Sequence, residues 1–322
     1  MKKQIFSLLL LFLFTIFHSQ KRIINDFSED YFVEITPNKD MHLLKLFANK
    51  QKKPIFSIDV TLSAYDFESL ESNVIETPYG HQSIVIFDDF NFDGKEDIAV
   101  KYGNESCYGG PSYEVYLYQN GTFKHSAEFS ALGQMYCGFF EIDDEKKQIH
   151  TMTKSGCCWH QFSEFVVKNN KPVPIKIVEE KYEGDYLVNK IEEWKNGKHT
   201  VRIENQLLID DLQDNIVLKA VLENGKTLYL LKSNGDYLFY YFTDNDLIEL
   251  MYSDKFFYSK SDNAVQFTND DATYKIFNDR IEINYKDKIN IAKFSKEGRL
   301  GNVSDVYQTF KEKALENLEI VD

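Results

Sequence analysis

The sequence has little positive charge, little proline or glycine, and no long apolar run after its first 20 residues. Thirty-seven Lys and Arg stand against 51 Asp and Glu, which gives a formal net charge of −14. Nucleic-acid proteins and proteins that dock on anionic membranes need the opposite balance, so both classes are excluded. Six Pro and fifteen Gly in 322 residues exclude a collagen-like or low-complexity chain. Hydrophobic residues make up 43% of the chain, which is enough to form a core.

The one long apolar run lies at the N-terminus. Lys2 and Lys3 precede an apolar stretch over residues 5–17, and the chain becomes polar at 18–20. This pattern is typical of a secretory signal peptide, here residues 1–20, and the stretch is shorter than the roughly 20 residues of a membrane span. An uncleaved anchor is the alternative. We therefore expect an exported protein, periplasmic or extracellular, with no membrane segment after signal cleavage.

Only four cysteines are present, and they are Cys107, Cys137, Cys157 and Cys158. An even number in an exported chain predicts disulfide bonds. Adjacent residues of a strand face opposite sides, so we expect Cys157 and Cys158 to pair with different partners, one with Cys107 and the other with Cys137. Both connectivities fit the sequence. A zinc site from Cys157, Cys158 and His160 is an alternative, but a second ligand pair is lacking.

Proline and cysteine are confined to the first part of the chain. All six Pro lie at or before position 174, and the rest of the sequence has neither residue type. This change predicts a domain boundary near residues 171–180, with the last two prolines in a stiff connector. We expect one domain over residues 21–175 and a second over 180–322.

Both parts have the composition of β-structure. Asn-Gly pairs at 120–121, 196–197, 224–225 and 234–235 predict tight hairpin turns. Runs dense in Val, Ile, Tyr and Phe predict strands. These runs are residues 83–87, 98–102, 113–118, 150–153, 162–168, 227–231, 237–242, 264–268, 273–277 and 281–285. The fold class is therefore mostly β, with an antiparallel β-meander in the second domain.

One helix is predicted, at the C-terminal end of the second domain. Ser304 is a suitable N-cap residue. The apolar residues Val306, Phe310, Ala314 and Leu318 follow at four-residue spacing, which places them on one face of a helix.

The motif with the most specific chemistry begins at residue 89. Oxygen-bearing side chains occupy loop positions 1, 3, 5 and 9, as Asp89, Asn91, Asp93 and Asp97. Ca²⁺ takes six to eight oxygen ligands, which alternate side chains, a backbone carbonyl and water can supply together. The spacing therefore predicts a Ca²⁺ site, with an acidic turn that binds no metal as the alternative.

The remaining loop residues fit this prediction but differ from an EF-hand. Gly94 at position 6 permits a sharp turn, and Lys95 at position 7 offers its backbone carbonyl as a ligand. Position 12 is Val100 rather than the Glu of an EF-hand, so Asp97 takes the place of the closing carboxylate. Strands rather than helices flank the loop. Phe90 and Phe92 alternate with the ligands and are expected to point into the core.

The order of these features resembles that of a known family. The loop over 89–100 is followed by Gly109-Gly110, a strand-like run over 113–118, and Gly121-Thr122-Phe123. This order, over roughly residues 75–175, resembles the bacterial periplasmic lysozyme-inhibitor and immunity proteins. The resemblance implies a β-propeller-like N-terminal domain with one integrin-type (FG-GAP-like) calcium loop. It implies Asp89, Asn91, Asp93, Lys95 and Asp97 as the ligands.

Candidate catalytic groups are scattered. The sequence contains no HExxH, nucleophile-elbow or P-loop motif. Glu141 with Glu164 is one conceivable acid pair, but such pairs arise by chance among 51 acids. A thiol–imidazole pair of Cys157 or Cys158 with His160 competes with a disulfide, which an oxidising compartment favours. We therefore expect no catalytic residue.

These features predict an exported, calcium-stabilised binding protein rather than an enzyme. The expected partner is a protein, in particular a basic cell-wall hydrolase of the lysozyme type that this protein inhibits, since its acidity would attract a cationic ligand. An extracellular adhesion or carbohydrate-binding module is the first alternative. A secreted hydrolase with an unrecognised acid pair is the second.

Overall fold

The computed structural model describes residues 21–322, except 26–27, 63–83, 233–235, 287 and 313–314. The predicted signal peptide, the start of the strand predicted over 83–87, the Asn-Gly turn at 234–235 and Ala314 lie outside the described residues. Two compact units are present, Met1–Glu179 with Glu192–Val201, and Glu180–Ile191 with Arg202–Asp322. We call them unit 1 and unit 2. No described helix has the length and apolar character of a membrane-spanning segment.

Unit 1 begins with two four-stranded antiparallel sheets, each with its strands in chain order. The first contains β1 (Arg22–Ile24), β2 (Tyr31–Asn38), β3 (Met41–Ala48) and β4 (Phe56–Val60). The second contains β5 (Val85–Asp88), β6 (Asp97–Ser106), β7 (Gly110–Gln119) and β8 (Thr122–His125). Such four-stranded meanders are the repeating unit of propeller blades. Asn120 and Gly121 both have positive φ angles, as the predicted turn between β7 and β8 requires.

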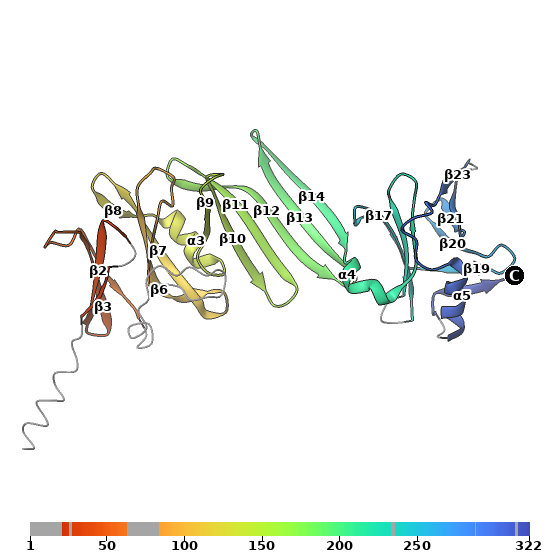
Figure 1. The fold of residues 1–322 in the computed structure, drawn as a ribbon, viewed down its shortest axis with the longest axis horizontal. Helices are drawn as coiled ribbons and strands as arrows, with labels where there is room; N and C mark the ends of the chain where they lie inside the picture. Colours follow the sequence, from red (N-terminus) through yellow and green to blue (C-terminus); the bar gives the residue numbers. More distant parts are fainter. Residues whose placement is uncertain (1–20, 26–27, 63–83, 233–235, 287, 313–314) are drawn as a thin grey trace, which may run out of the picture. The chain divides into compact units, whose positions relative to one another are not determined.

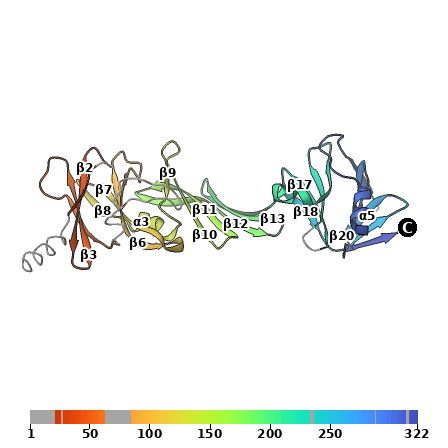
Figure 2. The same ribbon diagram turned by 60° about the horizontal axis from the view of Figure 1, so that its bottom comes forward.

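The sheet β5–β8 is buried on both faces, which explains its nearly continuous apolar runs. Val85 and Ile98 face one side and pack with the sheet β1–β4. Ile86, Ala99 and Tyr113 face the other side. They pack with helix α3 (Ala127–Met135) and the strands after it. Figures 1 and 2 show β2 and β3 on one side of β6 and β7, and α3 on the other. The segment predicted to bind calcium therefore joins two strands, β5 and β6, that are held between two cores.

Helix α3 was not predicted. The Ser126 hydroxyl accepts a hydrogen bond from the Phe129 amide and caps the helix. Phe129 and Leu132 are buried against the sheet, but the apolar spacing over nine residues is too short to produce a clear helical period.

A further set of long strands completes unit 1 and leads into unit 2. β9 (Glu141–Asp143), β10 (Gln148–Ser155) and β11 (Trp159–Lys168) pair in order. β12 (Lys171–Glu183), β13 (Tyr186–Lys195) and β14 (Lys198–Leu207) follow, and each has residues in both units. Pro172 and Pro174 lie within β12, a strand that has residues in both units. Each of these prolines lacks a backbone N–H. Alternate residues of a strand direct their N–H groups to the same edge, so the two missing hydrogen-bond donors lie on one edge of β12. The domain bounds predicted from composition stay a prediction.

Unit 2, like unit 1, contains four antiparallel strands that have an apolar core on each face. After α4 (Ile209–Leu212) and the 3₁₀ turn η3 (Gln213–Asn215), four antiparallel strands pair in chain order. They are β15 (Ile216–Val221), β16 (Thr227–Lys232), β17 (Leu238–Asp244) and β18 (Leu247–Tyr252). Leu228 and Leu230 enter one core, whereas Tyr229 and Leu231 enter another on the opposite face. The alternation of apolar side chains on both faces explains the unbroken run of this strand.

The remaining elements of unit 2 are a six-stranded sheet and a helix. The sheet has the order β23–β22–β21–β20–β19–β24. Its strands are β19 (Phe256–Ser259), β20 (Ala264–Asn269), β21 (Ala272–Ile276), β22 (Arg280–Tyr285), β23 (Lys288–Lys293) and β24 (Leu318–Val321). Val303 and Val306 of α5 (Val303–Glu312) are buried in the core that also contains Leu228 and Leu230. Leu318 starts β24 instead of continuing the helix, because it pairs with Phe256 in a parallel ladder.

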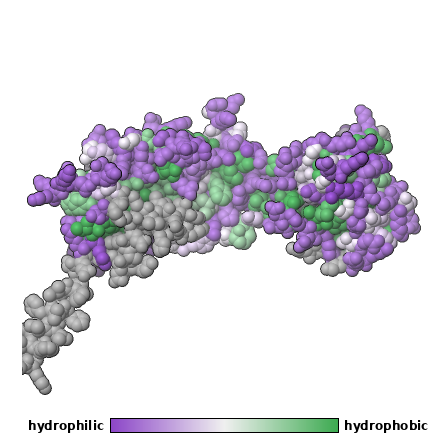
Figure 3. Space-filling model, viewed as in Figure 1, coloured by the Kyte–Doolittle hydropathy of each residue, from purple (hydrophilic) through white to green (hydrophobic). Residues whose placement is uncertain are grey.

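The mostly β, antiparallel fold class is confirmed, and every predicted strand overlaps an observed one. Each sheet in the described part of the chain is open, with two edge strands. Hydrophilic residues predominate among the coloured residues on the face that Figure 3 shows.

Candidate functional site

The predicted calcium loop is the connection between β5 and β6. Asp88 and Asp97 are directly paired across the two strands, so the loop is closed at its base by the antiparallel ladder. The expected strand–loop–strand context is therefore observed. Phe90 is fully buried, and Phe92 is partly buried against the same core, as the alternation predicted.

Side-chain oxygens of the loop accept hydrogen bonds from loop amides. Asp89 Oδ1 accepts from the Asp93 amide at 2.9 Å, and Asp89 Oδ2 accepts from the Gly94 amide at 2.7 Å. Asn91 Oδ1 accepts from the Asp93 amide at 3.0 Å, and Asp93 Oδ1 accepts from the Lys95 amide at 3.0 Å. Phe92 and Gly94 have φ angles of 62° and 83°. These turns wind the backbone around the side-chain oxygens at the predicted ligand positions.

Asp97 joins the loop to the rest of the sheet. Its side chain is completely buried. One carboxylate oxygen accepts a hydrogen bond from the Phe90 amide at 3.1 Å, and the other accepts from the Tyr118 amide of β7 at 2.7 Å. Burial raises the pKa of this carboxyl to about 7, and the charges of Asp93 and Asp89 add to the shift. The raised pKa of Asp97 therefore reflects its burial first and the neighbouring negative charges second.

The donor set fits a hard cation in composition. Three carboxylates and one amide oxygen lie within nine residues, and carboxylate oxygens that accept an amide hydrogen bond retain a second lone pair. Asn91 is anchored from outside the loop, because its Nδ2 donates to Asn170 Oδ1 at 3.3 Å. Among the described residues, however, no three His, Cys, Asp or Glu side chains converge closely enough to hold a metal. A Ca²⁺ site here therefore also depends on Asn91 and on the Lys95 carbonyl.

The cysteines pair as Cys107–Cys137 and Cys157–Cys158. The expectation that Cys157 and Cys158 take different partners is wrong. It assumed strand geometry, but both residues lie in the turn between β10 and β11, where strict alternation does not hold. Since both sulfurs are oxidised, neither is a thiolate for zinc or for a thiol–imidazole pair with His160, so both alternatives are overturned.

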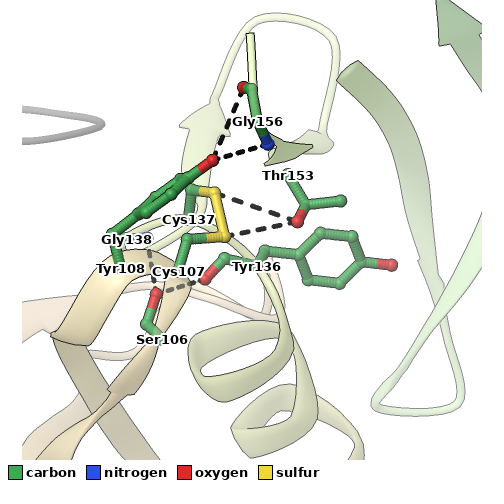
Figure 4. Close-up of a disulfide and its surroundings, with 8 residues drawn as sticks. All are labelled: Ser106, Cys107, Tyr108, Tyr136, Cys137, Gly138, Thr153 and Gly156. Carbon is green, nitrogen blue, oxygen red and sulfur yellow. Dashed lines mark hydrogen bonds between the residues drawn. A yellow bond between two sulfur atoms is a disulfide. The ribbon is translucent and has the colours of Figure 1, made fainter. Parts of the chain in front are cut away.

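The Cys107–Cys137 bond connects the 3₁₀ turn η2 (Cys107–Gly109) to the segment after α3. Figure 4 shows the Thr153 hydroxyl of β10 beside both sulfurs, at 3.3 Å from Cys107 and 3.8 Å from Cys137. Ser106 Oγ donates to the Tyr136 carbonyl and accepts from the Gly138 amide at 3.0 Å. The disulfide is therefore one of several contacts that join η2 to the chain around residue 137.

Tyr108 makes a second connection in the same region. Its hydroxyl accepts a hydrogen bond from the Gly156 amide at 2.7 Å, beside the Cys157–Cys158 turn (Figure 4). The Lys154 ammonium lies 5.4 Å from the centre of the Tyr108 ring. Tyr108 and Gly156 are 48 positions apart, so the spacing of residues gives no signal for this contact.

Glu141 and Glu164 are brought onto neighbouring positions of one sheet. His150 of β10 is paired with Glu141 of β9 on one side and with Glu164 of β11 on the other. His150 Nε2 lies 4.0 Å from Asp143 Oδ2, and Glu164 forms an ion pair of 3.4 Å with Lys176. The two acids are therefore separated by a histidine, an arrangement that was not predicted.

Comparisons with known proteins give no family assignment. No protein-family profile and no curated protein matches the sequence. A type IV secretion system related protein from Xanthomonas is 24% identical, with 56% of this chain and 92% of that chain covered and a TM-score of 0.44. The protein lmo1340 from Listeria monocytogenes EGD-e is 11% identical, with coverages of 85% and 82% and a TM-score of 0.25. The Dos1 propeller is 10% identical, with coverages of 91% and 68% and a TM-score of 0.22. All three TM-scores are below 0.5, so the strand order and the loop described above define the fold and the site.

Proposed function

We propose that this chain is an exported, calcium-stabilised binding protein that inhibits a basic cell-wall hydrolase of the lysozyme type. The single observation that carries the proposal is the β5–β6 loop, whose spacing of ligands and family-like surroundings occur together in one structural element. The protein acts by occupying its partner and performs no catalysis of its own.

Asp89, Asn91, Asp93 and Asp97 hold the ion through their side chains, and Lys95 through its backbone carbonyl. Bound Ca²⁺ supplies positive charge to the acidic loop and fixes its conformation. Asp97 links this loop to β7 through the Tyr118 amide, so a fixed loop also fixes the neighbouring strand. Calcium therefore has a structural role in the binding surface.

The charge of the chain supports a cationic partner. Beside the loop lies a recess lined by Glu29, Asp30 and Glu96, with Lys95 as its one basic residue among the described lining residues. Tyr31 and Tyr118 also line it and provide aromatic surface. An acidic surface accelerates association with a basic protein, and salt weakens this effect.

The test is to incubate the purified mature protein with a panel of lysozymes and to measure complex formation and lytic activity. The proposal expects a complex with at least one enzyme, loss of its lytic activity, and weaker association as salt concentration rises. Asp93→Ala should weaken inhibition, whereas Asp144→Ala, which removes an exposed acid outside the loop, should not. Absence of any complex at low salt would remove the inhibitor function.

A further inference from the structure

The six-stranded sheet of unit 2 has an open edge at β23 (Figure 1). β23 pairs with β22 on one side, and no strand in the described part of the chain pairs with it on the other. An unpaired edge presents a row of backbone N–H and C=O groups that another strand can bind. The question is therefore which groups of β23 face this edge and what they suit.

The hydrogen-bond ladder decides which backbone groups face outward. The Phe294 amide donates to the Asp279 carbonyl at 2.9 Å, one position beyond the β22–β23 pairing. Alternate residues of an antiparallel strand bond to the same neighbour, so the even-numbered residues of β23 bond to β22. Ile289 and Ile291 therefore direct their N–H and C=O groups to the open edge.

A contact at the end of the strand agrees with this assignment. The Lys293 carbonyl accepts a hydrogen bond from the Glu223 amide at 3.3 Å, so this odd-numbered residue also faces away from β22. The same bond closes the edge at Lys293. The open part is therefore residues 288–292.

The side chains of the two outward-facing residues are apolar and exposed. Ile289 and Ile291 are 63% and 57% exposed, and the residues paired with them on β22 are the polar Asn284 and Glu282. The opposite face of β23 contacts the core through Ala292. β-Branched side chains on a strand pack well against apolar side chains directly opposite on a neighbouring strand.

The charge around this edge is positive in a chain whose net charge is −14. Residues 286–293 contain one Asp and three lysines, which are Lys286, Lys288 and Lys293. None of these lysines forms an ion pair with a residue that the structure describes, and the nearby acids Asp279 and Glu282 are both paired with Arg280. Like charges oppose pairing with a second copy of this edge, whereas an acidic strand is attracted.

We propose that β23 binds an extended, acidic segment of a partner protein, which adds a strand to this sheet. The segment bonds to the backbone of Ile289 and Ile291, places apolar side chains beside theirs, and directs its acids toward Lys288 and Lys293. Backbone bonds supply affinity in this mode of recognition, and alternate side chains supply specificity. The inference is independent of the proposed function, because it needs neither calcium nor a basic partner.

The test uses the peptide acetyl-Glu-Val-Thr-Val-Glu-amide and the mature protein labelled with ¹⁵N at isoleucine. The peptide has the same residue order in both directions, so it suits parallel and antiparallel pairing. Amide hydrogen exchange should be fast at Ile289 and Ile291 in the free protein and slow at Ile281 and Ile283, which bond within the sheet. Saturating peptide should slow exchange at Ile289 and Ile291. Unchanged exchange at both amides would overturn the proposal.

Two control peptides separate the contributions of charge and backbone. Replacing both Glu by Lys should weaken binding about tenfold, because two attractive charge contacts become repulsive. Methylation of both Val amide nitrogens should weaken binding at least tenfold, because it removes the donors to the edge. Binding of all three peptides with equal affinity would contradict the proposal.

Two protein variants locate the site. Ile291→Pro should weaken binding at least tenfold and leave Ile281 and Ile283 protected, because proline on an edge strand removes only the outward N–H. Lys288→Glu should weaken binding about fivefold, whereas Lys311→Glu, the same change at an exposed lysine of α5, should not. Unchanged binding in both edge variants would place the peptide elsewhere and overturn the proposal.

Sedimentation of the protein alone tests the other occupant. The proposal expects no dimer that depends on β23. A dimer in which the amides of Ile289 and Ile291 are already protected, and which Ile291→Pro dissociates, would show that a second copy covers the edge and would overturn the proposal.

Discussion

The β5–β6 loop and the tip of the β10–β11 hairpin are both surface connections of unit 1, but they are held in different ways. In the first, side-chain oxygens accept hydrogen bonds from amides two to seven positions away. In the second, Tyr108 reaches the hairpin tip from 48 positions earlier in the chain. The comparison shows that the spacing of residues in the sequence can predict a loop that is held by local contacts. The same spacing cannot predict a loop that is held by residues far away in the chain.

The largest effect is expected for Asp97→Ala, measured in EDTA so that calcium does not contribute. The substitution leaves the buried amides of Phe90 and Tyr118 without their acceptor. It should lower the free energy of unfolding by about 4 kcal/mol. Urea denaturation of the variant beside Asp144→Ala, which lies in an exposed turn, provides the comparison. Equal stability of the two variants would mean that the loop is not anchored through Asp97.

The second-largest effect is expected for loss of the Cys107–Cys137 disulfide. Cys107→Ser with Cys137→Ser opens a bond between residues 30 positions apart and should cost about 3.5 kcal/mol in unfolding free energy. Removing both Cys157 and Cys158 as serines should cost much less, since that bond closes no loop between distant residues. Thermal denaturation of the two double variants compares them. A larger loss for the second pair would reverse this ranking.

The smallest effect is expected for Tyr108→Phe. The change removes only the hydroxyl that accepts from the Gly156 amide, at a site where Tyr108 is 67% exposed. It should lower the unfolding free energy by about 0.5–1 kcal/mol and increase hydrogen exchange at the Gly156 amide. Unchanged exchange at that amide would show that the hairpin tip is held without Tyr108.

The sequence was sufficient to predict some of the strands and the position of the β5–β6 loop. Alternating or continuous apolar runs and Asn-Gly pairs act over a few residues, so they predicted β7 and the turn that follows it. The same holds for the spacing of Asp89, Asn91 and Asp93, whose oxygens lie within one turn-forming segment.

Other features depend on contacts that no local pattern contains. Helix α3 is stabilised by burial of Phe129 and Leu132 against the sheet rather than by a strong period. The cysteine pairing depends on whether residues 157–158 lie in a strand or a turn, and the composition does not decide this.

The measurement that tests the central claim most directly is calorimetric titration of Ca²⁺ into the EDTA-treated, dialysed mature protein, with a melting curve at each end point. We predict one Ca²⁺ per chain and a higher melting temperature with the ion, with both effects lost in Asp93→Ala and retained in Asp144→Ala. Ca²⁺ present at 100 times its dissociation constant should add about 2.7 kcal/mol to the unfolding free energy. No heat of binding and an unchanged melting temperature would show that the β5–β6 loop is an acidic turn that binds no calcium.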